Sequence, residues 1–477
     1  MQLASMSARK HFIDGQIVQR LLKVADFAVL GAGALMISLW VTSNSSSADA
    51  ASAILLIALI AVLLSLAAIR ALGRYELKQL ADGPRSTVYS FCAALIAGSS
   101  AFALAGLVMP LKPEWLAAWC SLLAIHIPVT RLGIAALVRP LVRDGRFRKR
   151  IAIVGGGKAA EAAIHLLEQS SGIDIEIVGL FDDRYDERSP ESIRRHRKIG
   201  KIEELAGFAR NERVDLIIAA IPLSAEARLL HILKRLWELP VDIRVSGQAS
   251  GLKLSPRAYT YLGKLPLLSV FDRPLSPWGA FLKSAMDKVI AVFAIIALSP
   301  LMVVTAIAVR WESKGPVIFK QKRYGFNNEL IEVFKFRSMY ADMGDATASK
   351  LVTRGDPRVT KVGRIIRKTS IDELPQLFNV LTGQLSLVGP RPHATQAKAA
   401  EELYDQVVDG YFARHKVKPG ITGWAQVTGW RGETDTREKI EQRVKHDLEY
   451  IDQWSLGFDL YILFKTPFAL LKTTNAY

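Results

Sequence analysis

Residues 289–309 read VIAVFAIIALSPLMVVTAIAV, a run of 21 residues without a charged side chain. By length this run can cross a bilayer, which takes about 20 residues. Pro300 interrupts it near the middle, because proline removes a backbone donor and clashes with the preceding helical turn. Two half-helices of about 11 residues would each reach about 16 Å at 1.5 Å per residue. That length is roughly half of a ~30 Å hydrocarbon core.

Basic residues flank the run on both sides, namely Lys283, Lys288, Arg310 and Lys314. Positive charge marks the cytoplasmic ends of membrane segments, so both ends carry the same signature. We therefore expect residues 283–310 to form a re-entrant helix-break-helix, broken at Ser299 and Pro300, that enters and leaves by one face. The alternative is a kinked spanning helix, which would put Trp311–Tyr477 outside the cell.

Four further apolar runs occupy the first third of the chain, at about 25–41, 51–69, 88–109 and 115–138. Lys and Arg gather before the first run, between the second and third, and after the fourth, which places both ends in the cytoplasm. We expect residues 1–145 to form a four-helix transmembrane bundle. His126 and Arg131 in the fourth helix are expected to lie near the cytoplasmic interface, where long polar side chains reach water.

The composition narrows the possible partners. The chain has 477 residues, half of them hydrophobic, and 62 basic against 45 acidic residues give a net charge of +17. Such a charge favours an anionic partner. We exclude nucleic acid, because the chain is held in a membrane and shows no known binding motif. Its two cysteines, Cys92 and Cys120, exclude a disulfide framework.

An α/β pattern follows the bundle, with strands expected at 151–154, 175–181, 214–221 and 241–245. Strands that alternate with helices predict a parallel, Rossmann-like sheet over residues 146–250, followed by a linker at 251–282. Gly155 and Gly157 open a helix, and Asp182 follows about 25 residues later. This is a weak dinucleotide fingerprint. Close packing of helix on strand explains the glycines without a nucleotide and is the favoured explanation, so nucleotide binding by these three residues stays open.

Residues 367–378 read RKTSIDELPQLF, in a region dense in Arg and Lys. Leucine and phenylalanine at helical spacing predict a helix that buries Leu374, Leu377, Phe378 and Leu381. Asp372 and Glu373 would then lie in its first turn, where the helix dipole favours negative charge. One reading is a capping box between Ser370 and Glu373. The other is a nucleophilic aspartate that forms an acyl phosphate, beside a carboxylate that binds Mg²⁺.

The region from Lys283 to about Thr466 resembles the bacterial sugar transferase family, the monotopic polyprenyl-phosphate phosphoglycosyl transferases. The matching motifs, in chain order, are Lys283-x-x-x-Asp287, Ser299-Pro300, Gly315-Pro316-x-x-Phe319-x-Gln321-x-Arg323-x-Gly325, Phe334-Lys335-Phe336-Arg337-Ser338-Met339, Asp356-x-Arg358-x-Thr360-x-x-Gly363, Asp372-Glu373, Leu387-Val388-Gly389-Pro390-Arg391-Pro392 and Lys418-Pro419-Gly420-Ile421-Thr422-Gly423. The bundle and the α/β domain resemble the long form of this family, whose members initiate exopolysaccharide or O-antigen assembly.

The resemblance implies a monotopic α/β catalytic domain at residues 283–477, on the cytoplasmic face of the bacterial inner membrane. It implies that a UDP-sugar and undecaprenyl phosphate give undecaprenyl-diphospho-sugar and UMP, with Asp372 as nucleophile and Glu373 as Mg²⁺ ligand. The phosphates would be held by Lys335, Arg337, Arg367 and Arg391. Glucose 1-phosphate is expected as the transferred group, with galactose 1-phosphate as the alternative, and membrane lipid and a second copy of the chain are the further partners expected.

A membrane-anchored, NAD-dependent nucleotide-sugar dehydratase or epimerase is the competing class of enzyme. It would explain the apolar helices and the glycine turn. Such enzymes use a Tyr-x-x-x-Lys pair after the nucleotide domain, and the match here, Tyr461-x-x-x-Lys465, lies about 300 residues beyond the turn in an apolar helix. This placement disfavours the dehydratase reading.

Overall fold

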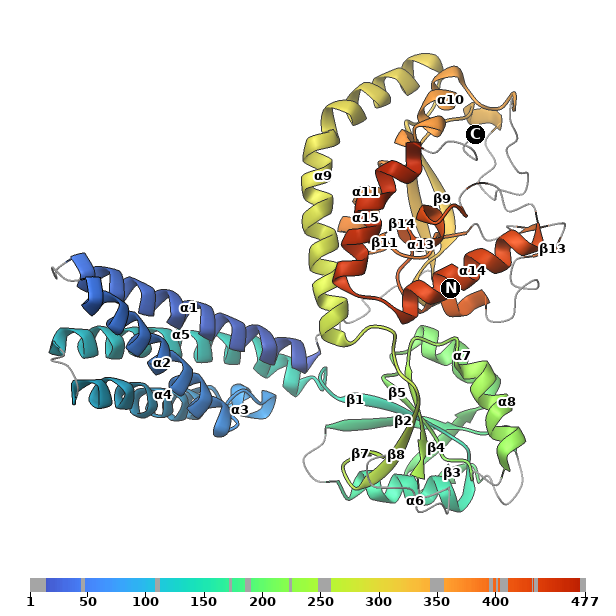
Figure 1. Ribbon diagram of the computed structural model, residues 1–477. Helices are drawn as coiled ribbons and strands as arrows, with labels where there is room; N and C mark the ends of the chain where they lie inside the picture. Colours follow the sequence, from blue (N-terminus) through green and yellow to red (C-terminus); the bar gives the residue numbers. More distant parts are fainter. Residues whose placement is uncertain are drawn as a thin grey trace. The chain divides into compact units, whose positions relative to one another are not determined.

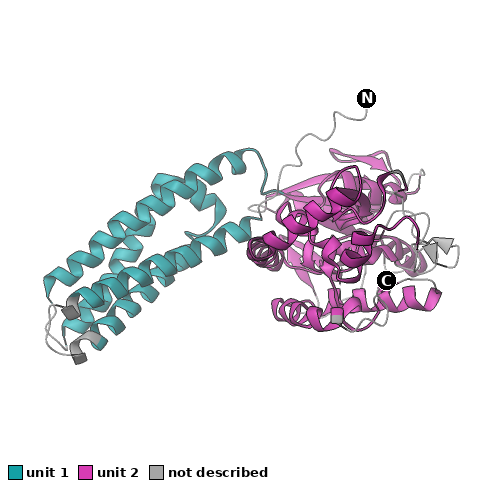
Figure 2. Cartoon of the chain, turned by 90° about the horizontal axis from the view of Figure 1, so that it is seen from above, with its two compact units in different colours: residues 1–148 teal, residues 149–477 magenta. Residues whose placement is uncertain are grey.

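The computed structural model describes residues 14–43, 48–107, 112–170, 174–184, 190–222, 225–247, 259–343, 356–393, 398–399, 402–403, 411–430, 432 and 436–471. The chain divides into two compact units, Met1–Arg148 and Lys149–Tyr477, coloured teal and magenta in Figure 2.

The first unit is helical. It contains α1 (Gly15–Ser43), α2 (Ala48–Ala71), the short α3 (Leu77–Ala81), α4 (Gly83–Gly106) and α5 (Pro113–Arg143). The long helices α1, α2, α4 and α5 fall on the four predicted apolar runs, and each contains a segment long and apolar enough to cross a membrane. They pack on one another through a core that includes Leu30, Ala58 and Trp119, all without exposed surface. The unit is therefore a helical membrane domain.

The bundle holds a buried ionic cluster that the sequence analysis did not predict. Arg131 Nη2 lies 2.7 Å from Asp26 Oδ2, and His126 Nε2 lies 3.0 Å from Asp26 Oδ1. Tyr75 Oη donates to Asp26 Oδ2 at 2.8 Å. Asp26 and Arg131 have no exposed surface and His126 is 6% exposed. The expectation that His126 and Arg131 reach out to an aqueous interface is wrong, because an acid on α1 pairs with them inside the unit.

The second unit begins with an eight-stranded sheet in the order β3-β4-β2-β1-β5-β6-β8-β7. The strands are β1 (Lys149–Val154), β2 (Ile175–Phe181), β3 (Ser192–Ile193), β4 (His196–Gly200), β5 (Leu216–Ala219), β6 (Asp242–Ser246), β7 (Thr260–Leu262) and β8 (Leu265–Phe271). The four predicted strands are confirmed as β1, β2, β5 and β6, and they pair in parallel. The expected linker at 251–282 is wrong for 260–271, because β8 pairs antiparallel with β6 and extends the sheet.

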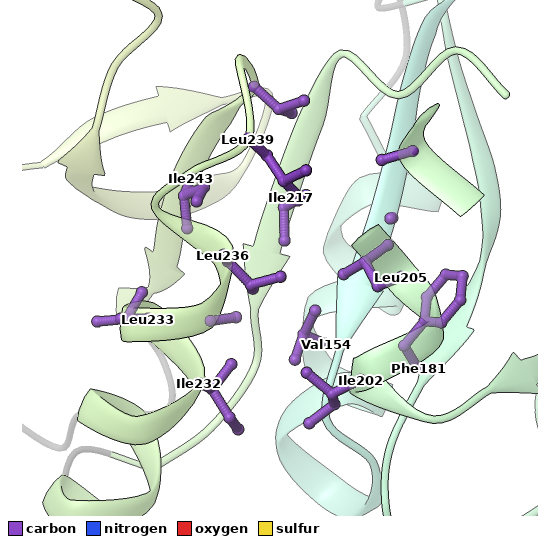
Figure 3. Close-up of a cluster of buried hydrophobic side chains, with 14 of the residues drawn as sticks. Val154, Phe181, Ile202, Leu205, Ile217, Ile232, Leu233, Leu236, Leu239 and Ile243 are labelled. Atoms are coloured by element: carbon purple, nitrogen blue, oxygen red, sulfur yellow. The ribbon is translucent and has the colours of Figure 1, made fainter. Parts of the chain in front are cut away.

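Helices α6 (Gly157–Glu168), α7 (Ile202–Asn211) and α8 (Glu226–Leu236) cover the sheet. Figure 3 shows one side of its core, where strand residues such as Val154 and Ile217 meet Leu205 and Leu236 from α7 and α8. All four are at most 1% exposed. Since β1 and β5 bury side chains on both faces, their sequences are continuous apolar runs, as parallel strands require.

Helix α9 (Pro277–Glu312) contains the apolar run and is one continuous, curved helix (Figure 1). The predicted break at Ser299 and Pro300 is therefore wrong in one respect, since the chain stays helical there. Pro300 has no N–H to donate to the carbonyl of Ile296, four residues earlier. The Ser299 hydroxyl donates to that carbonyl instead, at 2.8 Å. The serine thus satisfies the acceptor that the proline leaves open, and the helix continues.

A small α/β body packs against α9. The antiparallel pair β9 (Ile318–Tyr324) and β10 (Leu330–Phe336) forms a hairpin across η4 (Phe326–Asn328), and β11 (Ser386–Val388) pairs in parallel with β14 (Gly420–Thr422). The remaining elements are η5 (Ala341–Met343), α10 (Lys361–Lys368), η6 (Ile371–Glu373), α11 (Gln376–Leu381), β12 (Lys398–Ala399), β13 (Glu402–Leu403), η7 (Tyr411–Lys416), α13 (Trp424–Val427), α14 (Arg437–Asp452) and α15 (Leu456–Leu471). Their shared core includes Ala291 of α9, Val388 and Ile462.

Candidate active site

Two predicted site residues, Lys335 and Arg391, meet a third, Glu373, at the end of η6. Lys335 on β10 donates to Glu373 Oε1 at 2.8 Å. Arg391, which follows β11, donates through Nη2 to Oε1 at 2.6 Å and through Nη1 to Oε2 at 3.2 Å. The Glu373 side chain is 14% exposed and that of Lys335 17%. The fold thus brings residues from three parts of the chain into one partly buried ionic cluster.

The local backbone differs from the predicted helix start. Asp372 and Glu373 lie in the 3₁₀ turn η6, ahead of α11, and Ser370 adopts a left-handed conformation at φ 59° without a side-chain cap hydrogen bond. The capping box is therefore wrong, and the Glu373 carboxylate binds Lys335 and Arg391 instead. Phe378 is also not on the buried face, since it is 43% exposed, whereas Leu377 is 6% exposed.

Asp372 lies in the field of this cluster. Burial and the neighbouring carboxylate of Glu373 together raise the pKa of Asp372 to about 6, against the lowering effect of Lys335, Arg367 and Arg391. Within the described part of the chain, no side chain donates a hydrogen bond to the Asp372 carboxylate. With a pKa of about 6, the group is mainly ionised at neutral pH, and none of the described side chains occupies its oxygens.

Glu373 stays ionised for the opposite reason. Burial would raise the pKa of Glu373, but Arg391 and Lys335 outweigh it and hold this pKa well below its usual range. In turn, Glu373 raises the pKa of Arg391. Two adjacent carboxylates thus have distinct surroundings, one paired with cations and one open.

The other two predicted phosphate ligands differ in their placement. Arg367 is in the last turn of α10, and its charge acts on Asp372. Arg337 is buried away from this cluster at the end of α9, where Nη2 donates to the Ser313 carbonyl at 2.6 Å and to its hydroxyl at 2.9 Å. The structure therefore brings Arg367 toward Asp372, while Arg337 holds the C-terminal end of α9.

The two carboxylates of η6 are a suitable donor set for Mg²⁺. This ion is commonly bound by one or two carboxylates, with water and substrate phosphates completing its shell. Glu373 uses three of the roughly four acceptor positions of a carboxylate in its bonds to Lys335 and Arg391. One position remains on Glu373, the residue that follows Asp372 in the chain. Among the described residues, no group of three or more His, Cys, Asp or Glu could hold a metal ion.

The weak nucleotide fingerprint forms the expected turn. Gly155 and Gly157 have φ of 105° and 72°, and a Cβ on Gly155 would lie 2.9 Å from the Ala220 carbonyl oxygen. This close approach supports the packing explanation for Gly155. The Asp182 carboxylate is buried and ion-paired with Arg184 and Arg228 at 2.9 and 2.7 Å. Nucleotide binding at these residues remains a prediction.

Three buried polar contacts in the catalytic body involve residues that were not predicted from the sequence. Asp459 on α15 accepts from Lys283 Nζ at 2.6 Å, and Asp287 accepts from Ser386 at 2.6 Å. Arg414 on η7 binds the backbone of Arg391. The Lys283-x-x-x-Asp287 motif was the one available signal, because its two side chains lie on one face of a helix. Their partners are about 100 residues or more away in the chain and leave no local pattern.

Comparison with known proteins identifies the region that carries this cluster. Residues 278–473 match a family model described as bacterial sugar transferase. Residues 71–247 match a second model, described as a CoA-binding domain.

Relatives that match most of the chain bear similar names. The chain is 38% identical to undecaprenyl-phosphate glucose phosphotransferase of Komagataeibacter xylinus over 413 residues, 85% of this chain and 72% of the relative. It is 38% identical to the UDP-glucose:undecaprenyl-phosphate glucose-1-phosphate transferase of Escherichia coli K12, over 76% of each chain. It is 31% identical to undecaprenyl-phosphate galactose phosphotransferase of Salmonella typhimurium, again over 76% of each.

Proposed function

Because the chain belongs to the bacterial sugar transferase family and is a phosphotransferase, we propose that it transfers glucose 1-phosphate from UDP-glucose to undecaprenyl phosphate and releases UMP. The observation that carries this proposal is the pair of unlike carboxylates in η6. Asp372 is ionised and open, while Glu373 is paired with Lys335 and Arg391.

The first step uses Asp372 as nucleophile. One carboxylate oxygen attacks the sugar-linked phosphorus of UDP-glucose, and the bond from that phosphorus to the bridging oxygen breaks. The electron pair of this bond leaves with UMP, and an aspartyl-phosphoglucose remains on the enzyme. A carboxylate is an established kind of nucleophile for such covalent steps.

The second step regenerates the carboxylate. A phosphate oxygen of undecaprenyl phosphate attacks the same phosphorus, and the bond to Asp372 breaks with its electron pair on the carboxylate. Phosphoryl transfer depends mainly on positioning and charge neutralisation. Lys335, Arg367 and Arg391 supply positive charge around Asp372 in both steps. Mg²⁺, when bound by Glu373 together with substrate oxygens, would neutralise the negative charge of the diphosphate.

Contacts at the two ends of α9 support a re-entrant membrane helix. Near its beginning, Lys283 binds Asp459 of α15. Near its end, Glu312 accepts from the amides of Lys361 and Val362 on α10 at 2.6 and 2.8 Å. Both ends therefore contact one folded body, which a helix spanning the bilayer would not allow. The middle of the helix exposes large apolar side chains, including Phe293, Ile296, Val303 and Val304, each more than half exposed.

This placement would let a lipid phosphate and a soluble nucleotide reach the same site. We place the catalytic body on the cytoplasmic face of the bacterial inner membrane, where UDP-sugars are made, with α1, α2, α4 and α5 as a four-helix transmembrane bundle. In this position the enzyme would initiate exopolysaccharide or O-antigen synthesis, as a homodimer in our proposal.

The direct test is release of UMP by the purified full-length protein. UDP-glucose and undecaprenyl phosphate should give UMP in the presence of Mg²⁺, and omission of the lipid phosphate or chelation of the metal should stop turnover. The Asp372→Asn variant is the control for contaminating activity. No UMP from any UDP-sugar, with folded protein, would contradict the proposed function.

Galactose 1-phosphate is the alternative group. A relative of 31% identity carries galactose in its name, whereas two relatives of 38% identity carry glucose. Parallel assays with UDP-glucose and UDP-galactose decide between them. A higher kcat/KM for UDP-galactose would replace glucose in the proposal and leave the reaction class unchanged.

A further inference from the structure

The backbone beside Arg391 is held at four consecutive carbonyls, those of residues 390–393. Each accepts one hydrogen bond from a different donor. In chain order of the acceptors, these donors are Gly420 N at 3.0 Å, Arg414 Nη2 at 2.7 Å, Arg323 Nη1 at 2.6 Å and Tyr324 N at 3.5 Å. The donors come from β14, η7 and β9. Residues 390–393, called the clamped segment below, are thus tied to three separate elements.

The sequence of the clamped segment adds stiffness. Pro390 and Pro392 flank Arg391, and proline fixes its own φ near −65° and restricts the residue before it. The backbone of Arg391 therefore has little freedom. Its side chain, in contrast, is long and 35% exposed, with its two arms on Glu373. The position of the guanidinium is set by where the clamped segment holds its Cα.

Two of these donors, Arg414 and Arg323, act through their side chains. Arg414 is the more deeply buried of the two, with 1% exposure. Its Nη2 donates both to the Arg391 carbonyl and to Asp447 Oδ2 on α14, the latter at 2.6 Å. Its Nη1 contacts Nδ1 of His393 at 2.7 Å. One planar guanidinium thus joins α14 to the clamped segment at two points. A lysine, with a single nitrogen, cannot reproduce this fork.

A direct electrostatic effect on Asp372 does not explain why residue 414 is an arginine. The charges that act most strongly on Asp372 belong to its close neighbours Lys335, Glu373, Arg367 and Arg391. The charge of Arg414 acts instead on His393, whose pKa burial and Arg414 both lower, and on Asp447. The route from Arg414 to the active site therefore runs through the backbone of Arg391.

We propose that Arg414 is a positioning residue, which sets the guanidinium of Arg391 against Glu373 by holding the clamped segment to α14. The proposal rests on the proposed function for its kinetic consequence. Misplacement of a positioned group by about 1 Å can cost about 100-fold in rate. Loss of the Arg414 fork should therefore lower kcat, although Arg414 contacts neither Asp372 nor Glu373 directly.

The test is a double-mutant cycle in the full-length protein, with UMP release as the assay. Arg414→Lys should lower kcat by about 10- to 100-fold with a smaller change in KM. In an Arg391→Lys background, the same substitution should lower kcat less than about threefold, because residues that act as one unit are not additive. Arg443→Lys is the matched control, since Arg443 is also a buried arginine that binds backbone carbonyls, at Trp430 and Gly432.

A second variant covers the case in which Arg414→Lys does not fold. Arg323→Lys keeps the positive charge but loses the fork that joins Gln321 to the Pro392 carbonyl. It should show the same loss of kcat and the same dependence on Arg391. An equal loss of kcat in both Arg391 backgrounds, or wild-type kcat in the single variant, would overturn the proposal.

Hydrogen–deuterium exchange separates this inference from the proposed function. Peptides covering residues 386–393 should take up deuterium faster in Arg414→Lys than in wild type and in Arg443→Lys, whether or not the protein turns over a UDP-sugar. Failure of the wild type to release UMP would contradict the proposed function alone. Unchanged exchange in folded Arg414→Lys would contradict the role of Arg414.

Discussion

The substitution Glu373→Gln tests the ionic cluster most sharply. It keeps the shape of the side chain and one acceptor oxygen but removes the charge that faces Lys335 and Arg391. Hydrogen bonds to charged groups contribute about 1.5–3 kcal/mol each. Because the Arg391 side chain is 35% exposed and that of Lys335 17%, solvent screening reduces the total. We expect a loss of about 2 kcal/mol in the free energy of unfolding.

That loss corresponds to a fall in Tm of about 4–8 °C for a domain of 150–250 residues. A capping residue would give a different result, because glutamine still serves a capping box and costs well under about 1 kcal/mol. Thermal unfolding of the protein in detergent, followed by tryptophan fluorescence, measures this change in Tm. The double variant Glu373→Gln with Lys335→Met should recover part of the Tm, since both members of the ion pair are then neutral.

The pH dependence gives a second readout of the same cluster. Arg391 and Lys335 hold the pKa of Glu373 below its ordinary value of 4.5 in the folded protein. Its stabilising effect is therefore complete above the unfolded-state pKa and is lost as the pH falls through the folded-state pKa. The gap in Tm between wild type and Glu373→Gln should be full at pH 7 and narrow below about pH 4.5.

Turnover should fall further than stability. Loss of one preorganised charged group at a reacting centre costs about 100-fold or more in kcat, and the double variant with Lys335→Met should not recover it. Assays at increasing Mg²⁺ would show a raised requirement for the metal. Wild-type kcat with an unchanged metal requirement would refute the reasoning, even if the Tm were lowered.

Further predictions concern the nucleophile, the membrane helix and the α/β domain. Asp372→Asn should abolish UMP release without lowering the Tm. Labelled UDP-glucose should leave phosphoglucose on the wild-type protein only. Turnover of Asp372→Asn near the wild-type rate would exclude the covalent step. Since the pKa of Asp372 is raised to about 6 and the ionised form is needed, kcat/KM should rise with pH through about 6; a flat profile between pH 5 and 7 would contradict this. Single cysteines near Lys283 and Lys314, in a cysteine-free background, should both label from the cytoplasm, and Pro300→Leu should move the second label toward the periplasm. A protein beginning near Leu275 should fold, bind membrane and release UMP; if it folds but is inactive, the sheet domain contributes to the site.

Local sequence patterns predicted most of the strands of the sheet but did not predict pairings between strands that are distant in the chain. The strand at Ile175–Phe181 was placed to the residue, because an apolar run bounded by polar residues is a local signal. The strand β8 was missed, since Pro266 within it disfavours a strand. It lies at a register that places Leu267 opposite Ser246 on β6, and this antiparallel pairing after parallel strands has no local signature.

The candidate site shows the same division. Lys335, Glu373 and Arg391 were predicted together through the resemblance to a family, and they do meet. Arg337 has the same side-chain chemistry as Arg391 but binds the end of α9. Nothing in the arginine side chain itself predicts which of the two binds Glu373 and which binds the end of α9, because the partners depend on where folding places each side chain.

The ion pair between Asp26 and Arg131 bears on how the protein is made. The two residues are 105 positions apart, on α1 and α5. During synthesis α1 reaches the bilayer first, and an acidic side chain in the middle of a membrane helix costs about 2.5–3.5 kcal/mol until it is paired. The partner arrives only when the last helix of the bundle has left the ribosome. A chain that stops before Arg131 would therefore leave Asp26 without its guanidinium partner, with only Tyr75 and His126 to bind its carboxylate.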